Sequence, residues 1–213
     1  DIRDINKYSN FIFKNSKAME NKYMITNKQI DDFYKYNQNL NVNGGRKLGL
    51  KILSSLGRFK TYGKNRDSLT YNTTQLSAYL HFTTISIREV YFKIVEKLGK
   101  KSILINQLIW RDFYANVVYN FPHLLRGQIS NSNNLSFKAE FDRLKMPKNT
   151  KWFNMWCNGQ TGFPIVDAAM RSMNQTGFMH NRGRMIVSNF LIKVLLIDWR
   201  WGEQYFAQKL YDY

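Results

Sequence analysis

The sequence predicts an all-α fold, a bundle of several helices, and three observations support this prediction. Apolar residues recur at the three- and four-residue spacing of helices along most of the chain after residue 44. The strict alternation of apolar and polar residues that marks a half-buried strand is not seen. Three prolines among 213 residues leave long helices unbroken, and a hydrophobic content of 44% is enough for a core.

The first part of the chain divides into a leader, a helix and a loop. Residues 1–43 are polar and rich in Asn, Lys and Tyr, and we assign them to a leader ahead of one helical domain at 44–213. The first expected helix covers Leu48–Phe59, after the glycines of "NVNGG". These glycines resemble a phosphate loop only weakly, because no strand precedes them and the Lys-Ser/Thr signature is missing. A loop rich in turn residues follows, "KTYGKNRDSLTYNTTQLS".

The next two helices have clear ends. The segment "SIREVYFKIVEKLG" begins with Ser86 and Glu89 at the spacing of a capping box and stops at Gly99. The segment "ILINQLIWRDFYANVVYNF" runs to Pro122, where a helix cannot continue. Residues 126–150 show little pattern and are expected to form a polar connection.

The last part of the chain predicts three further helices. "FPIVDAAMRSMNQTG" starts with Pro164 at a first-turn position and ends at Gly177. "TGFMHNRGRMIVSNF" follows and becomes strongly apolar through "LIKVLLIDW", so we expect a buried helix here. Asn181 and Arg184 stand at its beginning, where their polar groups need partners. "WGEQYFAQKLYDY" is the final expected helix.

The charge of the chain narrows the class of partner. Lys and Arg total 32 against 15 Asp and Glu, which gives a net charge of +17. Such a surplus favours a polyanionic partner, nucleic acid first and an acidic membrane surface second, although a merely soluble basic protein has the same property. The greasy run Met185–Trp199 is interrupted by polar residues and is too short to span a bilayer, so no membrane segment is expected.

Other chemistries find little support in the residues. Cys157 is the single cysteine, so no disulfide can form within the chain, which suits an intracellular, reducing compartment. The three histidines are scattered and lack ligands at metal-binding spacing, so zinc is not expected. No serine or cysteine occurs in the surroundings of a catalytic nucleophile. Trp199 and Trp201 are either core aromatics or a relay that passes electrons to a buried redox cofactor.

Two helical stripes share one combination of side chains. One stripe holds Asn181, Arg184, Met185 and Ser188, and the other holds Gln107, Trp110, Arg111 and Tyr114. Most of these positions supply an amide, a guanidinium or a large soft or aromatic group, which together suit a planar ligand with hydrogen-bonding edges and anionic groups. The alternative is that they pack helices together while their polar tips reach solvent or backbone.

The hydroxyl loop provides a candidate anion site. Thr73, Thr74 and Ser77 stand just ahead of an apolar helical run, where hydroxyls and free backbone N–H groups suit a phosphate. Ordinary capping of the helix is the alternative. Arg66 precedes them and either reaches a phosphate or pairs with Asp67.

Several long motifs resemble one family in the family's own order. "GQTGFPIVDAAMRSMNQTGFMHNRGRMIVSNFLIKVLLIDWRWGEQYF" resembles the flavin-binding helical domain of DNA photolyases and cryptochromes. "QLIWRDFYANVVYNFP" and "TTQLSAYLHFTTISIREVY" are similar to the same family's Trp-Arg-acidic-Phe-Tyr helix and phosphate loop. The resemblance runs from about Gly44 to Tyr213 and implies an all-helical domain that binds FAD. In the family, reduced flavin excited by blue light passes an electron to a pyrimidine dimer flipped out of DNA. The dimer splits and the electron returns to the flavin.

Carried over by position, the resemblance assigns three groups of residues. The FAD phosphates would be held by Tyr62, Thr73, Thr74, Gln75, Leu76 and Ser77, and the isoalloxazine ring would lie by Arg184 and Asp212. A dimer flipped out of DNA would be lined by Gln107, Trp110, Asn181 and Met185, with Tyr114 on the same stripe, and Arg66, Arg111 and Arg182 would serve near the DNA backbone. Trp199 matches a member of the tryptophan chain that reduces the flavin.

The departures from the family pattern shape the functional hypotheses. Gln75 replaces the phosphate-loop Arg, and Gln107 stands where dimer-type photolyases have Glu. The family's antenna domain is not seen, and its sequence continues beyond the position of Tyr213, so the chain resembles a photolyase truncated at both ends. The first hypothesis is a truncated or split cyclobutane-dimer photolyase that acts on dimer-containing DNA, with a second polypeptide supplying the rest. The alternatives are a cryptochrome-like light receptor and a cofactor-free DNA-binding or vestigial module.

Overall fold

The computed structural model describes residues 29, 37–126, 140 and 144–213. Asn39–Tyr213 form one compact unit. The described residues form helices and no strand, so the predicted all-α fold is confirmed. Most of the expected leader, and most of the expected connection at 126–150, lie outside the described residues.

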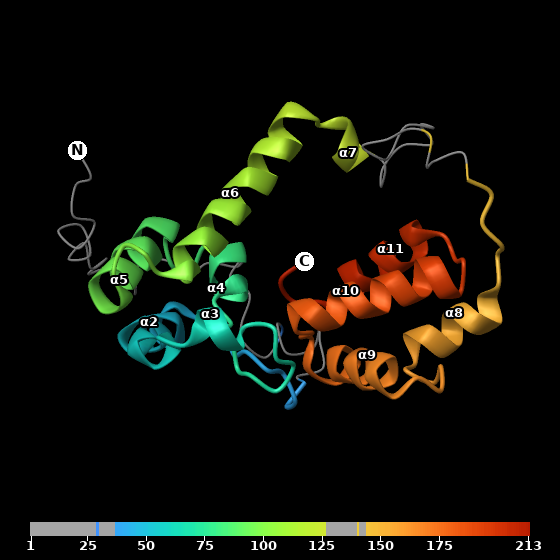
Figure 1. Ribbon diagram of the computed structural model, residues 1–213, viewed down its shortest axis with the longest axis horizontal. Helices are drawn as coiled ribbons and strands as arrows, with labels where there is room; N and C mark the ends of the chain where they lie inside the picture. The colour runs from blue at the N-terminus through green and yellow to red at the C-terminus, as the bar shows by residue number, and fades with distance from the viewer. Residues whose placement is uncertain (1–28, 30–36, 127–139, 141–143) are drawn as a thin grey trace. The chain divides into compact units, whose positions relative to one another are not determined.

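The first half of the unit is a group of helices that we call the N-terminal lobe (residues 44–126). Its elements are α2 (Arg46–Ser54), the 3₁₀-helix η3 (Leu56–Phe59), α3 (Tyr62–Asn65), α4 (Ser77–His81), α5 (Ile87–Leu98), α6 (Ile103–Asn120) and α7 (His123–Arg126). Their core includes Leu53, Leu56, Val90 and Ile94, all nearly inaccessible to solvent. The long helix α6 buries Leu104 and Ile105 in its first turn and then leaves α5 (Figure 1).

Helix ends in this lobe follow their capping residues, with one correction. The Ser86 hydroxyl accepts a hydrogen bond from the backbone N–H of Arg88, and α5 ends at Gly99 with a φ of 84°. Glu89 does not complete the expected capping box, because both of its carboxylate oxygens accept from the Arg46 guanidinium at 3.0 Å. The long-range ion pair offers Glu89 a charged donor, which binds a carboxylate more strongly than a neutral backbone N–H.

The second half is the C-terminal lobe (residues 150–213), which has its own core. Its elements are α8 (Thr150–Cys157), α9 (Pro164–Thr176), α10 (Asn181–Asn189), the π-helix η5 (Phe190–Val194) and α11 (Trp199–Lys209). Helix α9 begins at Pro164 and ends at the left-handed Gly177, as the sequence predicts. Helix α8 was not predicted; it begins at the cap Asn149 and buries Trp156 completely, with the indole N–H donating to the carbonyl of Val187 at 3.0 Å.

The expected continuous helix through the apolar run is wrong. Helix α10 ends at Asn189 and widens into η5. Leu196 then has a φ of 52°, in the left-handed region that ends helices, and the Asp198 side chain caps α11 by accepting from Arg200 N–H. The chain therefore turns within the run, and none of the helices in the described ranges is long and apolar enough to cross a bilayer.

A short segment at residues 39–43 connects the two lobes. The backbone N–H of Asn41 donates to the carbonyl of Thr176 in the C-terminal lobe at 3.1 Å. The hydroxyl of Tyr79 in the N-terminal lobe donates to the carbonyl of Asn43 at 2.7 Å. The lobes thus have separate cores, and the surfaces between them are free to form a binding site.

Candidate functional site

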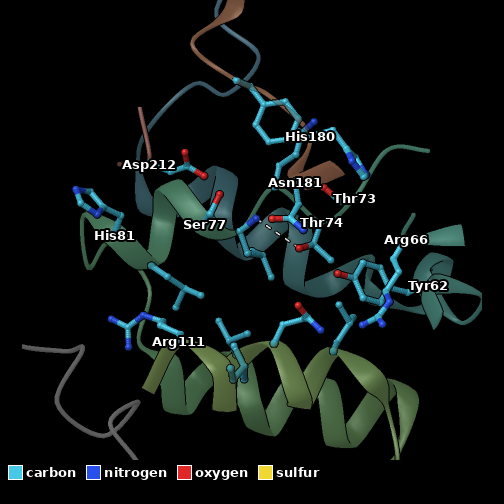
Figure 2. Close-up of a pocket in the computed structure, with 18 of the residues that line it drawn as sticks. Tyr62, Arg66, Thr73, Thr74, Ser77, His81, Arg111, His180, Asn181 and Asp212 are labelled. Carbon is cyan, nitrogen blue, oxygen red and sulfur yellow. Dashed lines mark hydrogen bonds between the residues drawn. The ribbon is translucent and has the colours of Figure 1, made fainter. Parts of the chain in front are cut away.

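A cavity of about 630 Å³ lies between the two lobes, which is within the range of small-molecule sites. Its polar lining consists of Tyr62, Arg66, Asp67, Thr73, Thr74, Gln75, Ser77, His81, Gln107, Arg111, His180, Asn181, Arg182, Arg184 and Asp212. Its apolar lining consists of Leu76, Leu80, Val90, Ile94, Leu104, Leu108, Phe178 and Met179. In Figure 2, α6 forms one side of the cavity, and the hydroxyl segment and the start of α10 lie opposite.

The hydroxyl segment, Thr73–Ser77, is an open loop that runs into Ser77, the first residue of α4. Leu76, which has no hydroxyl, is the N-cap of α4, and no side-chain cap bond is found there among the described residues. Thr74 Oγ1 accepts from the Leu76 N–H only at the long distance of 3.5 Å. Gln75 has a φ of 53°, a strained conformation for a residue with a side chain. Capping therefore does not explain this segment, which leaves the hydroxyls of Thr73 and Ser77 lining the cavity (Figure 2).

Arg184 and Asp212 form a partly buried ion pair in the wall of the cavity. Arg184 Nη2 lies 2.9 and 3.1 Å from the two carboxylate oxygens of Asp212, and Nε donates to the carbonyl of Met179 at 2.8 Å. The Asp212 side chain is 6% exposed and the Arg184 side chain 26%. The Arg184 guanidinium at the start of α10 therefore has partners within the protein, the Asp212 carboxylate and the Met179 carbonyl. A ligand would meet an arginine that is already positioned.

Asp67 pairs across the cavity with Arg182. Both Nε and Nη2 of Arg182 lie 2.9 Å from Asp67 Oδ1. The sequence left open whether Asp67 pairs with its neighbour Arg66; the structure assigns it to Arg182 of the other lobe instead. Four arginines and two aspartates line the cavity, and both aspartates are paired, so the lining keeps a positive surplus that favours an anionic ligand.

His180 is the N-cap of α10 and lines the same cavity. Its Nδ1 accepts a hydrogen bond from the backbone N–H of Arg182 at 3.1 Å, which requires an unprotonated Nδ1. Burial lowers the pKa of His180 below the ordinary value of 6.5, and Arg182 and Arg184 lower it further, while the backbone of Arg66 and the carboxylate of Asp67 oppose the shift. His180 therefore acts as a neutral helix cap.

The lowered pKa of His180 predicts a pH-dependent stability. The unfolded chain protonates this imidazole near pH 6.5, while the folded chain resists protonation until a lower pH. The contribution is fully present above about pH 6.5 and is lost as the pH falls toward the folded-state pKa. Urea unfolding between pH 7.5 and 5.5 should show a smaller pH slope in His180→Asn, because Asn caps a helix without titrating. An unchanged slope in this variant would contradict the assignment.

The two predicted stripes reach the cavity only in part. Gln107 and Arg111 of α6 and Asn181 and Arg184 of α10 line it. Trp110 and Tyr114 lie on the outer face of α6, 53% and 62% exposed, with their ring centroids 6.0 Å apart. Trp110 is therefore not a core residue. Its exposed ring is available to a planar group that approaches this face of the helix.

Met185 and Trp199, which the resemblance assigns to the lesion cavity and the electron relay, also lie outside the cavity. The Met185 sulfur lies 3.9 Å from the Asn181 amide nitrogen and 3.6 Å from Arg182 Nη1, and the residue is 46% exposed. Met185 thus contacts the cavity residues Asn181 and Arg182 without lining the cavity itself. Trp199 is half-buried at the start of α11, with the Arg200 guanidinium 5.9 Å from its ring. Its role as an electron relay stays a prediction.

Sequence reasoning missed several residues of the lining. Phe178, Met179 and His180 precede α10, and no motif reasoning from the residues singles them out as ligand contacts. Asp67 was considered only as a partner of its neighbour. Its true partner is 115 residues away, and a separation of this size leaves no local signal in a single sequence.

Metal and thiol chemistry find no site in the described parts of the chain. Groups of His, Cys, Asp and Glu that could hold a metal ion are absent from the residues described here. Burial raises the pKa of the Cys157 thiol to about 12, so this cysteine is an unreactive core residue.

Comparison with known families agrees with this geometry. Residues 104–213 match the model of the FAD-binding domain of DNA photolyase. The chain belongs to this family. The predicted resemblance is confirmed, and so is FAD as the cofactor of this kind of domain.

Two curated relatives are about 40% identical to this chain over most of its length. The chain is 41% identical over 162 residues to a deoxyribodipyrimidine photo-lyase of Vibrio cholerae and 40% identical over 158 residues to that of Escherichia coli. These alignments cover 73% and 71% of this chain but 33% and 32% of the relatives, so the chain spans about a third of their length.

Solved structures of the family share the fold. An archaeal photolyase from Sulfolobus tokodaii, solved with two FAD molecules, has a TM-score of 0.72 and 37% identity, and the match covers 88% of this chain and 40% of that one. A Synechocystis cryptochrome has a TM-score of 0.74 and 31% identity, with 86% of this chain and 40% of that chain covered.

Proposed function

We propose that the chain binds FAD between its two lobes and belongs to a photolyase-type protein that repairs pyrimidine dimers in DNA. The cavity itself is the observation that carries this proposal. It combines a hydroxyl-bearing loop, a positive surplus and a broad apolar wall, which are the surroundings that a dinucleotide with a pyrophosphate and planar rings requires. Bound FAD, once reduced, would supply the electron that light transfers to the lesion and that returns to the flavin after the dimer splits.

Each part of the lining has a distinct task in this proposal. Thr73, Thr74 and Ser77 would donate hydrogen bonds to the pyrophosphate, and Arg66 would add positive charge nearby. The Arg184–Asp212 pair would lie by the isoalloxazine ring. The two contacts between Arg184 Nη2 and the Asp212 carboxylate would fix the orientation of both side chains toward the ring. The aliphatic wall would exclude water from the rings of the cofactor.

The lesion would approach from the start of α10 and the outer face of α6. Gln107 and Asn181 would meet the polar edges of a flipped dimer, and Trp110 and Met185 would cover its planar and methyl surfaces. Arg111 and Arg182 would contact the neighbouring phosphates. The net charge of +17 supports this partner, because cationic side chains supply most of the affinity for DNA backbone.

We further propose that a complementary polypeptide segment covers Ile109 and Phe113 of α6 in the functional protein and leaves Trp110 open to the lesion. Ile109 and Phe113 lie one helical turn apart and are 60% and 50% exposed. Apolar side chains gathered on one face mark an interaction surface. The relatives, of which this chain spans about a third, have ample further sequence to supply such a segment.

Flavin binding can be tested with FAD and with riboflavin, which lacks the pyrophosphate and the adenosine of FAD. FAD should bind the 213-residue chain about tenfold more tightly than riboflavin, because charged groups add strong hydrogen bonds at the hydroxyl segment. A Thr73→Val, Thr74→Val, Ser77→Ala variant should lose this preference, and Thr70→Val, outside the cavity lining, should keep it. Quenching of flavin fluorescence measures both affinities. Equal affinities for FAD and riboflavin in the wild-type chain would contradict the phosphate site.

Repair can be tested by reducing the FAD-loaded chain with dithionite and then illuminating it with blue light in the presence of a thymine-dimer oligonucleotide. Loss of the dimer supports the photolyase function. Light-driven change of the flavin spectrum without loss of the dimer would favour the second candidate, a blue-light receptor, which the similarity to the Synechocystis cryptochrome also supports. A folded chain that binds duplex DNA but no flavin would favour the cofactor-free module.

A further inference from the structure

One ion pair reaches from lobe to lobe at the cavity. Of the ion pairs formed by the residues this structure describes, Asp67–Arg182 is the one whose partners belong to different lobes. Asp67 follows α3 in the N-terminal lobe, and Arg182 is the second residue of α10 in the C-terminal lobe. Two guanidinium nitrogens of Arg182 share one oxygen of Asp67, each at 2.9 Å.

This pair is accessible to a solute. The Arg182 side chain is 41% exposed and the Asp67 side chain 57%, in contrast to the 6% of Asp212 in the other pair of the cavity. The remaining terminal nitrogen of Arg182, Nη1, faces the sulfur of Met185 at 3.6 Å, a weak acceptor. A stronger anionic acceptor that reaches Nη1 would therefore displace only this weak contact with the Met185 sulfur.

The energetics of exposed pairs make an exchange of partners feasible. A solvent-exposed ion pair contributes little net stability, because water and salt screen it. A phosphate accepts two parallel hydrogen bonds from an arginine and carries a full charge. Replacing Asp67 by a phosphate therefore costs only the small stability of the exposed Asp67–Arg182 pair. This cost lowers the net affinity for the phosphate, because the pair must break before the phosphate can bind.

We propose that Asp67 competes with the DNA phosphate for Arg182 and so lowers the affinity of the chain for the DNA backbone. The inference rests on the proposed DNA-binding function and adds a positioning residue to it. In the free protein, Asp67 holds Arg182 extended across the cavity. On DNA, the phosphate takes the place of the Asp67 carboxylate, which releases the contact between the lobes.

The test compares two charge-removing variants of the full chain. Asp67→Asn frees Arg182, and the matched control Glu89→Gln frees Arg46, whose exposed pair with Glu89 lies away from the cavity lining. Both variants raise the net charge by one and release one arginine. Binding of a duplex that carries a single thymine dimer is measured by fluorescence anisotropy across a series of salt concentrations, with melting temperatures as a check on folding.

We expect Asp67→Asn to bind the duplex about two- to fivefold more tightly than Glu89→Gln, the range that an exposed pair can contribute. Its log–log salt slope should steepen by up to about one, because the freed Arg182 then counts fully in counterion release. In an Arg182→Gln background, the advantage of Asp67→Asn over Glu89→Gln should vanish.

Four outcomes would overturn the proposal. Equal affinity and slope in the two variants would mean that Asp67 acts only through overall charge. Weaker binding by Asp67→Asn would mean that Asp67 positions Arg182 for DNA and does not compete with it. An advantage that persists without Arg182 would assign the effect to another residue. A wild-type chain without salt-dependent duplex binding would contradict the proposed function itself, and the competition with it.

Discussion

Replacing Arg184 with Leu should lower the free energy of unfolding by about 2–4 kcal/mol, because it leaves the carboxylate of Asp212 buried without a charged partner. The Asp212 side chain is 6% exposed, so water cannot solvate it fully. The variant also removes the donor to the carbonyl of Met179. The estimate lies toward the lower end for buried pairs, since Arg184 is itself 26% exposed.

Chemical denaturation of the Arg184→Leu chain provides the measurement, and Arg46→Leu provides the control. Arg46 pairs with Glu89 through two hydrogen bonds of 3.0 Å, but its side chain is 52% exposed. Removing it should cost less than about 1 kcal/mol. An equal loss in the free energy of unfolding for the two variants would contradict a stabilising role of the Arg184–Asp212 pair in the cavity wall.

Replacing Trp110 with Ala should weaken binding of dimer-containing DNA by about 1–3 kcal/mol, the contribution of one aromatic stacking contact. The melting temperature should change little, because the ring is 53% exposed and its near neighbours Phe113 and Tyr114 are on the same helix. Affinity for undamaged duplex should also change little, since phosphate contacts supply it. The loss should therefore appear as a loss of discrimination.

Competition binding with damaged and undamaged duplexes measures this effect, with Tyr119→Ala as the control. Tyr119 is an aromatic residue of the same helix and is 84% exposed, farther along α6. It should leave the discrimination unchanged. A large drop in melting temperature for Trp110→Ala, or an equal loss on both duplexes, would contradict the role of Trp110 as a stacking platform.

The sequence predicts those parts of the fold that depend on local signals. Pro164 and Gly177 mark both ends of α9 because each residue acts through its own backbone. Ser86 and Gly99 do the same for α5. The turn after η5 escapes prediction because Leu196, an ordinary helix former, adopts the left-handed conformation there. Only packing against the surrounding chain can impose the left-handed conformation on Leu196.

In the candidate site too, local spacing predicts some residues, while the others depend on how the helices pack. Gln107 and Arg111 can be assigned to one helical face from their spacing, and both reach the cavity. Trp110 and Tyr114 fit the same spacing yet lie outside, because α6 carries apolar residues on most sides and spacing alone does not identify the buried one. The pairing of Asp67 with Arg182 depends on how two lobes meet, which single-sequence patterns do not encode.

FAD should bind in the cavity between the lobes, and a crystal structure of the 213-residue chain grown with FAD tests this most directly. We expect the pyrophosphate within hydrogen-bonding distance of Thr74 and Ser77 and the isoalloxazine ring beside the Arg184–Asp212 pair. Well-ordered FAD at any other place on the chain, with this cavity filled only by water, would contradict it.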